Sequence, residues 1–241
     1  MIKLTDYIQA VAFDLDGTLI DTAPDLTAAC NMMLAILGGH PLSELRVTAL
    51  IGSGVEQLVA GVLTLSRGGA APDPTQLETA ATLFRDFYRA RLFQRSRIYP
   101  GVIESLRALG RAGVFSCCIT NKESAFALPV IEAAGLGDLI GFTLCADRAE
   151  DRKPSPNMLL TACARIGIKP PRMLYVGDAQ SDVLAARAAG CRVVAVDYGY
   201  HNGLLLAAAG ADGVVSNLTE LVDIRARPAG AWTERRFGWS G

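Results

Sequence analysis

The sequence lacks several features that would each indicate a class of protein. Its 241 residues carry a formal net charge of −1, so there is no basic excess for binding a nucleic-acid backbone. No apolar stretch is long enough to span a bilayer, and Asp6 and Gln9 interrupt the N-terminal segment before it could form the apolar core of a signal peptide. These absences predict a cytoplasmic protein that binds neither nucleic acid nor a membrane.

The six cysteines show no Cys-x-x-Cys spacing and no metal-knuckle pattern. Most of them fall in apolar segments, where a free cysteine packs as a small hydrophobic residue. We therefore expect reduced core residues at all six positions. They are Cys30, Cys117, Cys118, Cys145, Cys163 and Cys191.

After residue 99 the chain alternates between helical and strand patterns. Val102, Leu106 and Leu109 recur at helical spacing, and the β-rich segment 114–120 follows. Further helices are expected over 123–134, 155–166 and 183–190, and strands over 142–145, 173–177 and 192–196. This alternation predicts an α/β fold in which a Rossmann-like parallel sheet is covered by helices, with ligands at the carboxyl ends of the strands.

Residues 21–95 show a helical pattern throughout. Three Ser/Thr-x-x-acid pairs are typical of capping boxes at helix starts, namely Thr22 with Asp25, Ser53 with Glu56, and Thr75 with Glu78. Apolar residues follow each pair at helical spacing. We therefore expect an inserted helical cap domain over 21–95, in a core made of residues 1–20 and 96–224. A tail over 225–241 carries Trp232 and Trp239.

Polar residues gather where the predicted strands end. They are Asp14, Asp16, Thr120, Lys153, Asp178 and Asp182. The carboxyl ends of parallel strands meet at one edge of a sheet, so these side chains are expected to converge. Crowded carboxylates raise one another's pKa unless a cation lies among them, and oxygen ligands suit Mg²⁺.

The two aspartates that follow the first strand have separate expected roles. Two positions apart on extended backbone, Asp14 and Asp16 should face the same way. The Asp14 carboxylate can attack phosphorus and form an aspartyl-phosphate, while Asp16 protonates the leaving group and later acts as a base. The phosphoryl charge would be met by the Thr120 hydroxyl, the Lys153 ammonium and backbone N–H groups near Leu15 and Asn121.

The stretches "DLDGTLIDT", "TNK", "KPSP" and "VGDAQSD" resemble, in order and at reasonable spacing, the four motifs of the haloacid dehalogenase superfamily of phosphotransferases. The resemblance covers almost the whole chain. It implies Asp14 as nucleophile and metal ligand, Asp16 as acid and base with its backbone carbonyl on the metal, Thr120 and Lys153 on the phosphate, and Asp178 on the metal with support from Asp182. The fourth stretch departs from the commoner pattern at Ala179 and Ser181, so a hydroxyl and an amide near the metal are missing.

Finer matches resemble one branch of that superfamily, the phosphoglycolate phosphatases. They are "DTAPDL", "IGSGVEQLV", "YPGV" and "GYHNG". The resemblance implies Mg²⁺-dependent hydrolysis of 2-phosphoglycolate to glycolate and phosphate. In the cap, Gly52, Ser53 and Gly54 could hold a substrate carboxylate on free N–H groups at a helix start, and an ordinary glycine-rich helix start is the alternative interpretation.

Residues that are missing decide between related activities. The cap has no lysine, which a phosphonate-cleaving relative would need for a Schiff base. A dehalogenase would not need Asp16 as an acid. A sugar-phosphate mutase would be expected to carry a histidine close after the first motif, and neither His40 nor His201 lies there. The alternatives are a phosphatase for another small or sugar phosphate, including N-acetylmuramate 6-phosphate, or such a mutase. A non-catalytic binding domain is disfavoured by the intact acids. We expect a small phosphorylated substrate as the partner of a monomer or homodimer.

Overall fold

The computed structural model describes residues 8–200 and 203–223. His201 and the predicted tail over 225–241, with Trp232 and Trp239, lie outside the described residues. Over the two described stretches, no helix combines the length and the apolar character that a membrane span needs.

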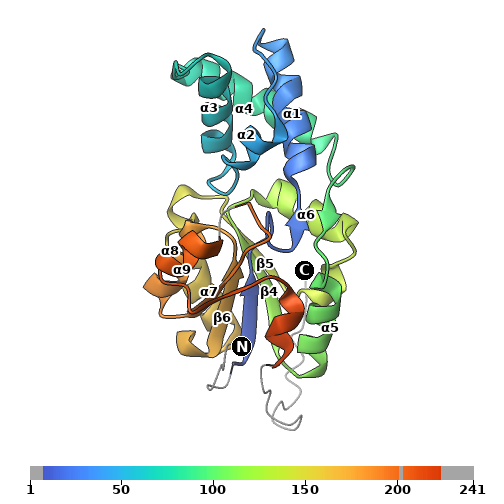
Figure 1. Ribbon diagram of the computed structural model, residues 1–241, viewed down its shortest axis with the longest axis vertical. Coiled ribbons are helices and arrows are strands. Elements are labelled where there is room, and N and C mark those ends of the chain that lie inside the picture. Colours follow the sequence, from blue (N-terminus) through green and yellow to red (C-terminus); the bar gives the residue numbers. More distant parts are fainter. Residues whose placement is uncertain (1–7, 201–202, 224–241) are drawn as a thin grey trace.

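A six-stranded parallel sheet lies in the lower part of the molecule as seen in Figure 1, and its strands follow the order β5-β4-β1-β6-β7-β8. The strands are β1 (Ala10–Phe13), β4 (Phe115–Thr120), β5 (Thr143–Cys145), β6 (Met173–Gly177), β7 (Arg192–Val196) and β8 (Gly213–Val215). The strand order reverses at β1, where Phe13 pairs with Cys118 of β4 and Val176 of β6. Ligands of open α/β sheets bind at the carboxyl ends beside such a reversal, and the α/β prediction is confirmed.

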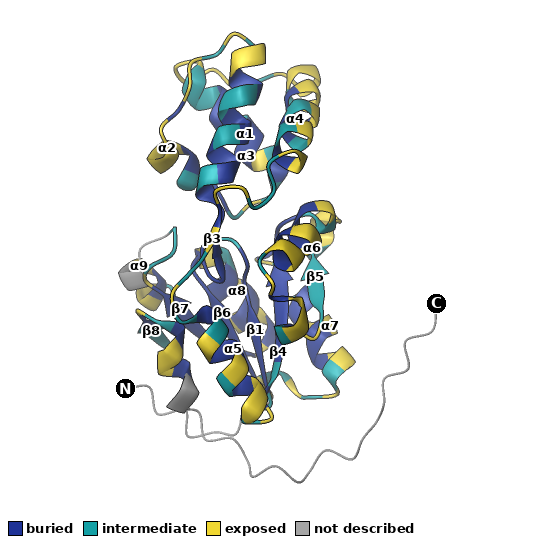
Figure 2. Ribbon diagram, turned by 90° about the vertical axis from the view of Figure 1, so that its right-hand side faces the viewer, coloured by how far each residue is buried: buried dark blue, intermediate teal, exposed yellow. Residues whose placement is uncertain are grey.

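Helices cover both faces of the sheet. Side chains alternate along β1, so that Val11 and Phe13 share one apolar cluster with α5 (Val102–Arg111) and α6 (Ser124–Ala133). Ala10 and Ala12 pack instead with α7 (Asn157–Ile166), α8 (Gln180–Ala189) and α9 (Gly203–Ala208). Short 3₁₀ turns are η1 (Gly137–Leu139), η2 (Ala149–Asp151), η3 (Pro170–Arg172) and η4 (Leu218–Asp223). The central strands β4, β1, β6 and β7 are mostly buried between these layers, whereas the edge strands β5 and β8 are partly exposed (Figure 2).

Four helices lie together beyond the carboxyl ends of the strands, and we call them the cap (Figures 1 and 2). They are α1 (Ala23–Ile36), α2 (Glu44–Thr48), α3 (Val55–Ser66) and α4 (Pro74–Arg89). Their apolar faces form a separate cluster, which Phe126 of α6 joins from the sheet side. The cap therefore follows the first strand, as the sequence predicts, while its boundaries at residues 21 and 95 stay predictions.

Two of the three predicted capping boxes fail because a neighbouring residue starts the helix. Asp73, not Thr75, precedes α4, and its carboxylate accepts a hydrogen bond from the backbone N–H of Gln76. Gly54, not Ser53, precedes α3, with φ of 91°, a backbone conformation that glycine adopts without strain. The helices occur where their apolar periodicity places them, but their first residues differ.

The third predicted capping box, at the start of α1, is absent for a different reason. The Thr22 hydroxyl donates to Asp16 Oδ1 at 2.6 Å instead of capping its helix. The Asp25 carboxylate accepts hydrogen bonds from the backbone N–H groups of Arg95 and Ser96 and from the Ser96 hydroxyl. Contacts between distant segments have therefore taken both side chains from the local motif.

A two-stranded antiparallel pair joins the two places where the chain passes between cap and sheet. Strand β2 (Ile20–Asp21) pairs with β3 (Arg97–Ile98), so that Ile20 lies opposite Ile98. The sequence analysis missed both strands, because two residues are too few to show an alternating pattern. It missed β8, of three residues, for the same reason.

All six cysteines are free, and five of them are buried. Cys145, at the end of β5, is partly exposed. The prediction of reduced core cysteines is confirmed for the five buried positions.

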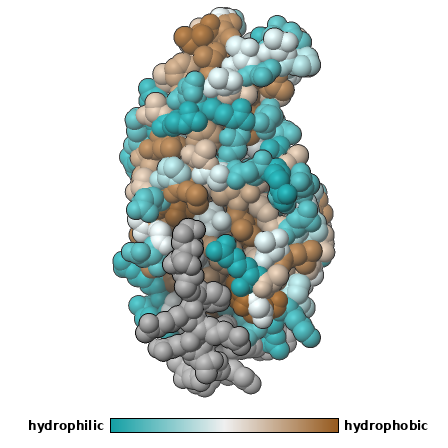
Figure 3. Space-filling view, turned by 180° about the vertical axis from the view of Figure 1, so that it is seen from behind, coloured by the Kyte–Doolittle hydropathy of each residue, from teal (hydrophilic) through white to brown (hydrophobic). Residues whose placement is uncertain are grey.

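The exposed large apolar side chains are spread over different helices. They are Ile36, Leu45, Leu128, Leu160, Leu184 and Leu205. On the face seen in Figure 3, hydrophilic residues lie between separate apolar groups. The predicted monomer or homodimer stays a prediction.

Candidate active site

Three strand ends supply the centre of the site. Asp14 follows β1, Thr120 ends β4, and Asp178 follows β6. The Asp14 backbone N–H donates to the carbonyl of Val176 at 2.9 Å, which fixes Asp14 beside the end of β6. All three polar residues are buried, with exposures of 5%, 2% and 2%. The parallel sheet thus brings together residues that are far apart in the sequence.

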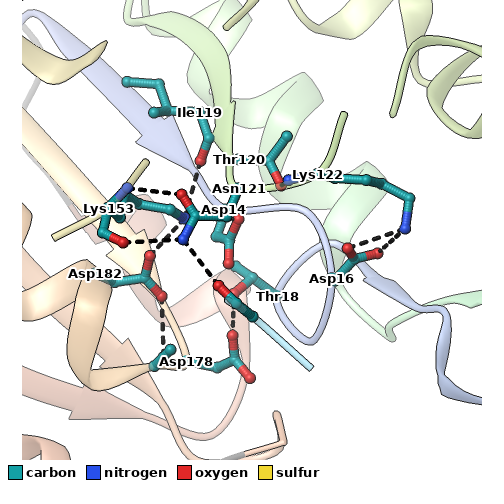
Figure 4. A network of polar contacts seen from close by, with 12 residues as sticks. Asp14, Asp16, Thr18, Ile119, Thr120, Asn121, Lys122, Lys153, Asp178 and Asp182 are labelled. Atoms are coloured by element: carbon teal, nitrogen blue, oxygen red, sulfur yellow. Dashed lines mark hydrogen bonds and ion pairs between the residues drawn. The ribbon is translucent and has the colours of Figure 1, made fainter. Parts of the chain in front are cut away.

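Asp14, Asp178 and Asp182 form an acidic group (Figure 4), in which one carboxylate oxygen from each lies within 4.8 Å of the others. Burial raises the pKa of Asp14 to about 7, although the charge of Lys153 opposes this effect. Burial, together with the charges of Asp14 and Asp182, also raises the pKa of Asp178 well above its usual range. Buried carboxylates that repel one another in this way fit a hard divalent cation with oxygen ligands.

Asp182 differs from the other two acids because protein donors already occupy its oxygens. It lies in the first turn of α8 and accepts hydrogen bonds from Lys153 Nζ at 2.6 Å, the Tyr175 hydroxyl at 3.1 Å and the Ala179 backbone N–H at 2.9 Å. These contacts suit a supporting residue, whereas Asp14 and Asp178 are better placed to offer oxygens to a cation.

Asp178 is oriented by the loop after β1 and by the segment after β7. Its oxygens accept hydrogen bonds from the Thr18 hydroxyl at 3.3 Å and from the Tyr200 backbone N–H at 2.7 Å. Gly17, with φ of 84°, lies so close that a Cβ there would come within 2.3 Å of Asp178 Oδ2. The glycine therefore makes room for the carboxylate.

Lys153 supplies the cation next to Asp14. Its ammonium lies 2.9 Å from Asp14 Oδ1 and 2.6 Å from Asp182 Oδ1. It also donates to the carbonyl of Ile119 and to the Tyr175 hydroxyl. Burial lowers the pKa of Lys153, but the charges of Asp14 and Asp182 outweigh this effect, so the pKa is raised and the group stays charged. A phosphate bound at Asp14 would meet this ammonium.

The Asn121 side chain connects the end of β4 to the segments that contain Gly52 and Lys153. Its amide nitrogen donates to the carbonyls of Gly52 and Lys153, and its oxygen accepts from the Lys153 backbone N–H at 2.7 Å. The Thr120 hydroxyl accepts a hydrogen bond from the Lys122 backbone N–H at 3.2 Å. Because the Asn121 amide is occupied, any contact of this residue with phosphate would come from its backbone.

Asp16 lies outside the acidic group. Strand β1 ends at Phe13, and Asp16 forms an isolated bridge with Ile20 instead of continuing that strand, so the expectation that one extended strand carries both Asp14 and Asp16 is wrong. Its carboxylate is directed at Lys122, whose ammonium lies 3.0 Å from each oxygen (Figure 4). The same carboxylate also accepts a hydrogen bond from the Thr22 hydroxyl. Asp14 and Asp16 nevertheless line the same pocket.

Lys122 was quoted in the "TNK" stretch without an assigned role. It is buried, with 7% exposure. Burial lowers the pKa of Lys122, but Asp16 and the neighbouring Tyr88 outweigh this effect, so the pKa is raised. Its ammonium also lies over the Tyr88 ring of α4, 4.7 Å from the centroid. The available signal for this residue was its position, two residues after Thr120, which ends β4 and is predicted to bind the phosphate.

Tyr200 is a second residue that the sequence analysis left without a role. Its hydroxyl accepts hydrogen bonds from the backbone N–H groups of Thr22 at 2.7 Å and Ala23 at 2.9 Å, and it donates to Asp21 Oδ1 at 3.1 Å. Its own backbone N–H donates to Asp178. Tyr200 thus connects the acidic group to the first residues of the cap.

A pocket of about 480 Å³, counting the part open to solvent, lies between cap and sheet. Its cap wall is mostly apolar, formed by Leu26, Ile51, Gly52, Gly54, Val55, Leu58, Phe84 and Tyr88. The sheet side contributes Asp14, Asp16, Thr120, Asn121, Lys122 and Phe126. Two of the three predicted cap residues therefore reach the pocket, while Ser53 is exposed and does not line it.

Charged residues connect cap and sheet beside this pocket. Arg85 of α4 contacts Glu56 of α3 at 2.5 Å and Glu123, which precedes α6, at 2.7 Å. Glu56 also pairs with Arg152 at 3.3 Å. Two of these pairs, Arg85 with Glu123 and Glu56 with Arg152, join a cap residue to a residue of the sheet side and therefore hold the two parts together.

Known proteins match this chain over most of its length. Residues 8–190 match the family model of haloacid dehalogenase-like hydrolases. The phosphoglycolate phosphatase of Nitrosospira multiformis is 44% identical over 213 residues, covering 88% of this chain and 93% of the relative. The N-acetylmuramic acid 6-phosphate phosphatase of Pseudomonas aeruginosa is 37% identical and covers 90% and 94%. A crystal structure of a predicted phosphoglycolate phosphatase from Haemophilus somnus 129pt gives a TM-score of 0.84 at 30% identity, covering 90% of this chain and 97% of that chain.

Proposed function

Because the chain belongs to the haloacid dehalogenase-like hydrolases, we propose that it hydrolyses a small phosphomonoester through an aspartyl-phosphate formed on Asp14. The observation that carries this proposal is the position of the buried Asp14 carboxylate, 2.9 Å from the Lys153 ammonium and within the acidic group. The proposed substrate is 2-phosphoglycolate and the products are glycolate and phosphate. The relative from Nitrosospira multiformis supports this choice, because it is named phosphoglycolate phosphatase and its match covers most of both chains.

We propose Mg²⁺ as the cofactor. Asp14 and Asp178 would hold it, with the backbone carbonyl of Asp16, and Asp182 would support them. The buried carboxylates and their raised pKa values support this assignment. When bound, the cation supplies the positive charge that allows a phosphate dianion to approach Asp14.

Each residue of the site then has a role in the reaction. The Asp14 carboxylate attacks phosphorus, while the Lys153 ammonium, the Thr120 hydroxyl and backbone N–H groups of Leu15 and Asn121 bind the phosphoryl oxygens. The Asp16 carboxyl gives a proton to the leaving alkoxide. It then removes a proton from the water that attacks the aspartyl-phosphate, and phosphate leaves.

The proposed domains give the cap a role in substrate choice. A core over 1–20 and 96–224 carries the phosphoryl-transfer residues, and a cap over 21–95 covers the leaving group. The predicted contacts of the substrate with Gly52, Ser53 and Gly54 belong to this proposal. So do the cytoplasmic location and the monomeric or homodimeric state.

A sugar phosphate is the second candidate substrate. The relative from Pseudomonas aeruginosa is named for N-acetylmuramic acid 6-phosphate and shares 37% identity with this chain. Both candidate substrates carry a carboxylate, but in the sugar it lies much farther from phosphorus. The two candidates can therefore be separated by comparing rates.

The test is a comparison of phosphate release from 2-phosphoglycolate, N-acetylmuramate 6-phosphate and ethyl phosphate, with Mg²⁺ and with excess chelator. We expect the highest kcat/KM for 2-phosphoglycolate, and no activity in chelator or in the Asp14→Asn variant. A sugar-phosphate mutase would release little phosphate, and a binding domain would release none. Full activity in chelator, or in Asp14→Asn, would refute the proposal.

A further inference from the structure

One polar group on the cap wall of the pocket has no acceptor for its proton. The Tyr88 hydroxyl is buried in a residue with 1% exposure, and the described group closest to bonding it, the Lys122 ammonium, can only donate to its oxygen. Tyr88 lies in the last turn of α4 and lines the pocket. A buried hydroxyl whose proton has no acceptor is destabilising, so a ligand that accepts its hydrogen bond would gain affinity.

The same end of the pocket holds one cation. Lys122 is the only cationic side chain among the described residues that line the pocket, and its ammonium lies over the Tyr88 ring. Of its three N–H donors, the two oxygens of Asp16 can accept two. An anion that approaches from the pocket can therefore share this ammonium with Asp16.

Lys122 and Tyr88 thus combine a positive charge with a neutral donor. Burial raises the pKa of Tyr88 to about 12, so the hydroxyl keeps its proton at neutral pH. The other cap residues on the wall are apolar or glycine, including Leu26, Leu58 and Phe84. A carboxylate on the leaving group finds no other cationic partner among the described residues that line the pocket.

We infer that the Lys122 ammonium and the Tyr88 hydroxyl together bind the carboxylate of a short phosphorylated acid. This inference rests on the proposed function and assigns its specificity to two residues. Lys122 Nζ lies 3.0 Å from Asp16, the proposed proton donor to the bridging oxygen. A carboxylate that reaches Lys122 must therefore lie close to that oxygen, as it does in 2-phosphoglycolate, where a single methylene separates them.

The start of α3 is less suited to this task. The Gly52 carbonyl accepts the Asn121 amide, and a Cβ on Gly54 would lie 2.7 Å from the Arg152 guanidinium, so that side chain already occupies the space outside Gly54. Arg152 itself is paired with Glu56 and Gln57. The carboxylate contact predicted for Gly52, Ser53 and Gly54 therefore competes with the subsite at Lys122 and Tyr88, and experiment can separate them.

The deciding quantity is the acid preference, defined as kcat/KM for 2-phosphoglycolate divided by kcat/KM for ethyl phosphate. In Tyr88→Phe, which keeps the ring, we expect KM for 2-phosphoglycolate to rise and the acid preference to fall about 10- to 100-fold, as expected for losing a hydrogen bond to a charged group. Ethyl phosphate should be hydrolysed nearly as before. Tyr99→Phe, which removes a hydroxyl outside the pocket lining, is the matched control and should leave the acid preference unchanged.

Lys122→Met tests the cation. Both substrates should react more slowly, because Lys122 also holds Asp16, but the acid preference should fall further because the ratio cancels damage to the chemistry. In the double variant the losses in acid preference should not add, since both residues bind one carboxylate.

The outcomes separate the inference from the proposed function. If the unaltered protein shows no acid preference, the proposed substrate is wrong. If it prefers 2-phosphoglycolate and Tyr88→Phe and Lys122→Met keep that preference, the inference is wrong while the proposed function stands. Loss of the preference in Gly54→Ala alone would assign the carboxylate to the start of α3 and would also overturn the inference.

Discussion

Replacing Tyr200 by phenylalanine tests how the acidic group is coupled to the cap. The change removes one oxygen that accepts two backbone N–H groups and donates to Asp21. In the variant, the Ala23 N–H keeps a second acceptor, Asp21 Oδ1 at 3.2 Å. The Thr22 N–H has no such second acceptor in Asp21 and loses its hydrogen bond. Because Tyr200 is half-buried, water can reach part of the gap. We expect a loss of about 1–2 kcal/mol in the free energy of unfolding.

The same variant should also affect catalysis, because Thr22 holds the proposed acid. The Thr22 hydroxyl donates to Asp16 at 2.6 Å, so a shift of Thr22 loosens Asp16. We expect kcat to fall more for 2-phosphoglycolate, which has a poor leaving group, than for p-nitrophenyl phosphate, which needs little protonation. The assays are urea denaturation and steady-state kinetics.

Tyr198→Phe is the matched control for Tyr200→Phe. It removes one hydroxyl that donates to the Thr18 carbonyl at 2.9 Å and does not contact the cap. It should cost less stability and change both substrates equally. The reasoning would be refuted if Tyr200→Phe were as stable as the unaltered protein and hydrolysed both substrates at its rates.

Three other perturbations address the acid, the cation and the loop after β1. Asp16→Asn should lower kcat about 10²–10⁴-fold for 2-phosphoglycolate and much less for p-nitrophenyl phosphate, and equal losses would show that Asp16 is not the acid. Mg²⁺ should raise the unfolding midpoint more at pH 8 than at pH 6. Burial raises the pKa of Asp14 in the metal-free fold from 3.8 to about 7. The free energy of unfolding of the metal-free protein therefore falls as the pH rises through that range. At pH 6 protons still bind Asp14 and compete with the cation. An equal midpoint shift at both pH values would contradict this interpretation. Gly17→Ala should weaken Mg²⁺ binding in calorimetry, because its Cβ would lie 2.3 Å from Asp178, whereas Gly113→Ala, also at positive φ but with no atom within 4 Å, should cost stability alone. If both variants bound Mg²⁺ as tightly as the unaltered protein, Gly17 would have no role in placing Asp178.

The sequence was sufficient to predict those features that depend on local patterns. Asp14 and Asp178 follow apolar strands directly, and parallel strands carry such residues to one edge of the sheet. The helical pattern of the cap was also readable, because each helix buries one apolar stripe. These features need no knowledge of which distant segments touch.

Features that depend on distant contacts could not be read in this way. Lys122 and Asp16 are 106 positions apart, and Tyr200 and Thr22 are 178 positions apart, so no local spacing pairs them. The capping box of Thr22 and Asp25 fits a local rule, but bonds to Asp16 and Ser96 replaced it. The alignment of Asp14 with Asp16 failed because the strand ends one residue before Asp14.

The formation of a phosphoryl group on Asp14 is the central claim, and acid quenching during turnover tests it most directly. The protein is mixed with 2-phosphoglycolate and Mg²⁺, quenched in acid within one turnover, digested and analysed by mass spectrometry. We expect the peptide that contains Asp14 to carry one phosphoryl group in the unaltered protein and none in Asp14→Asn. In Asp16→Asn, a larger fraction of this peptide should be phosphorylated if breakdown of the intermediate is slowed more than its formation. A phosphoryl group on another residue, or phosphate release by Asp14→Asn at the unaltered rate, would contradict the account.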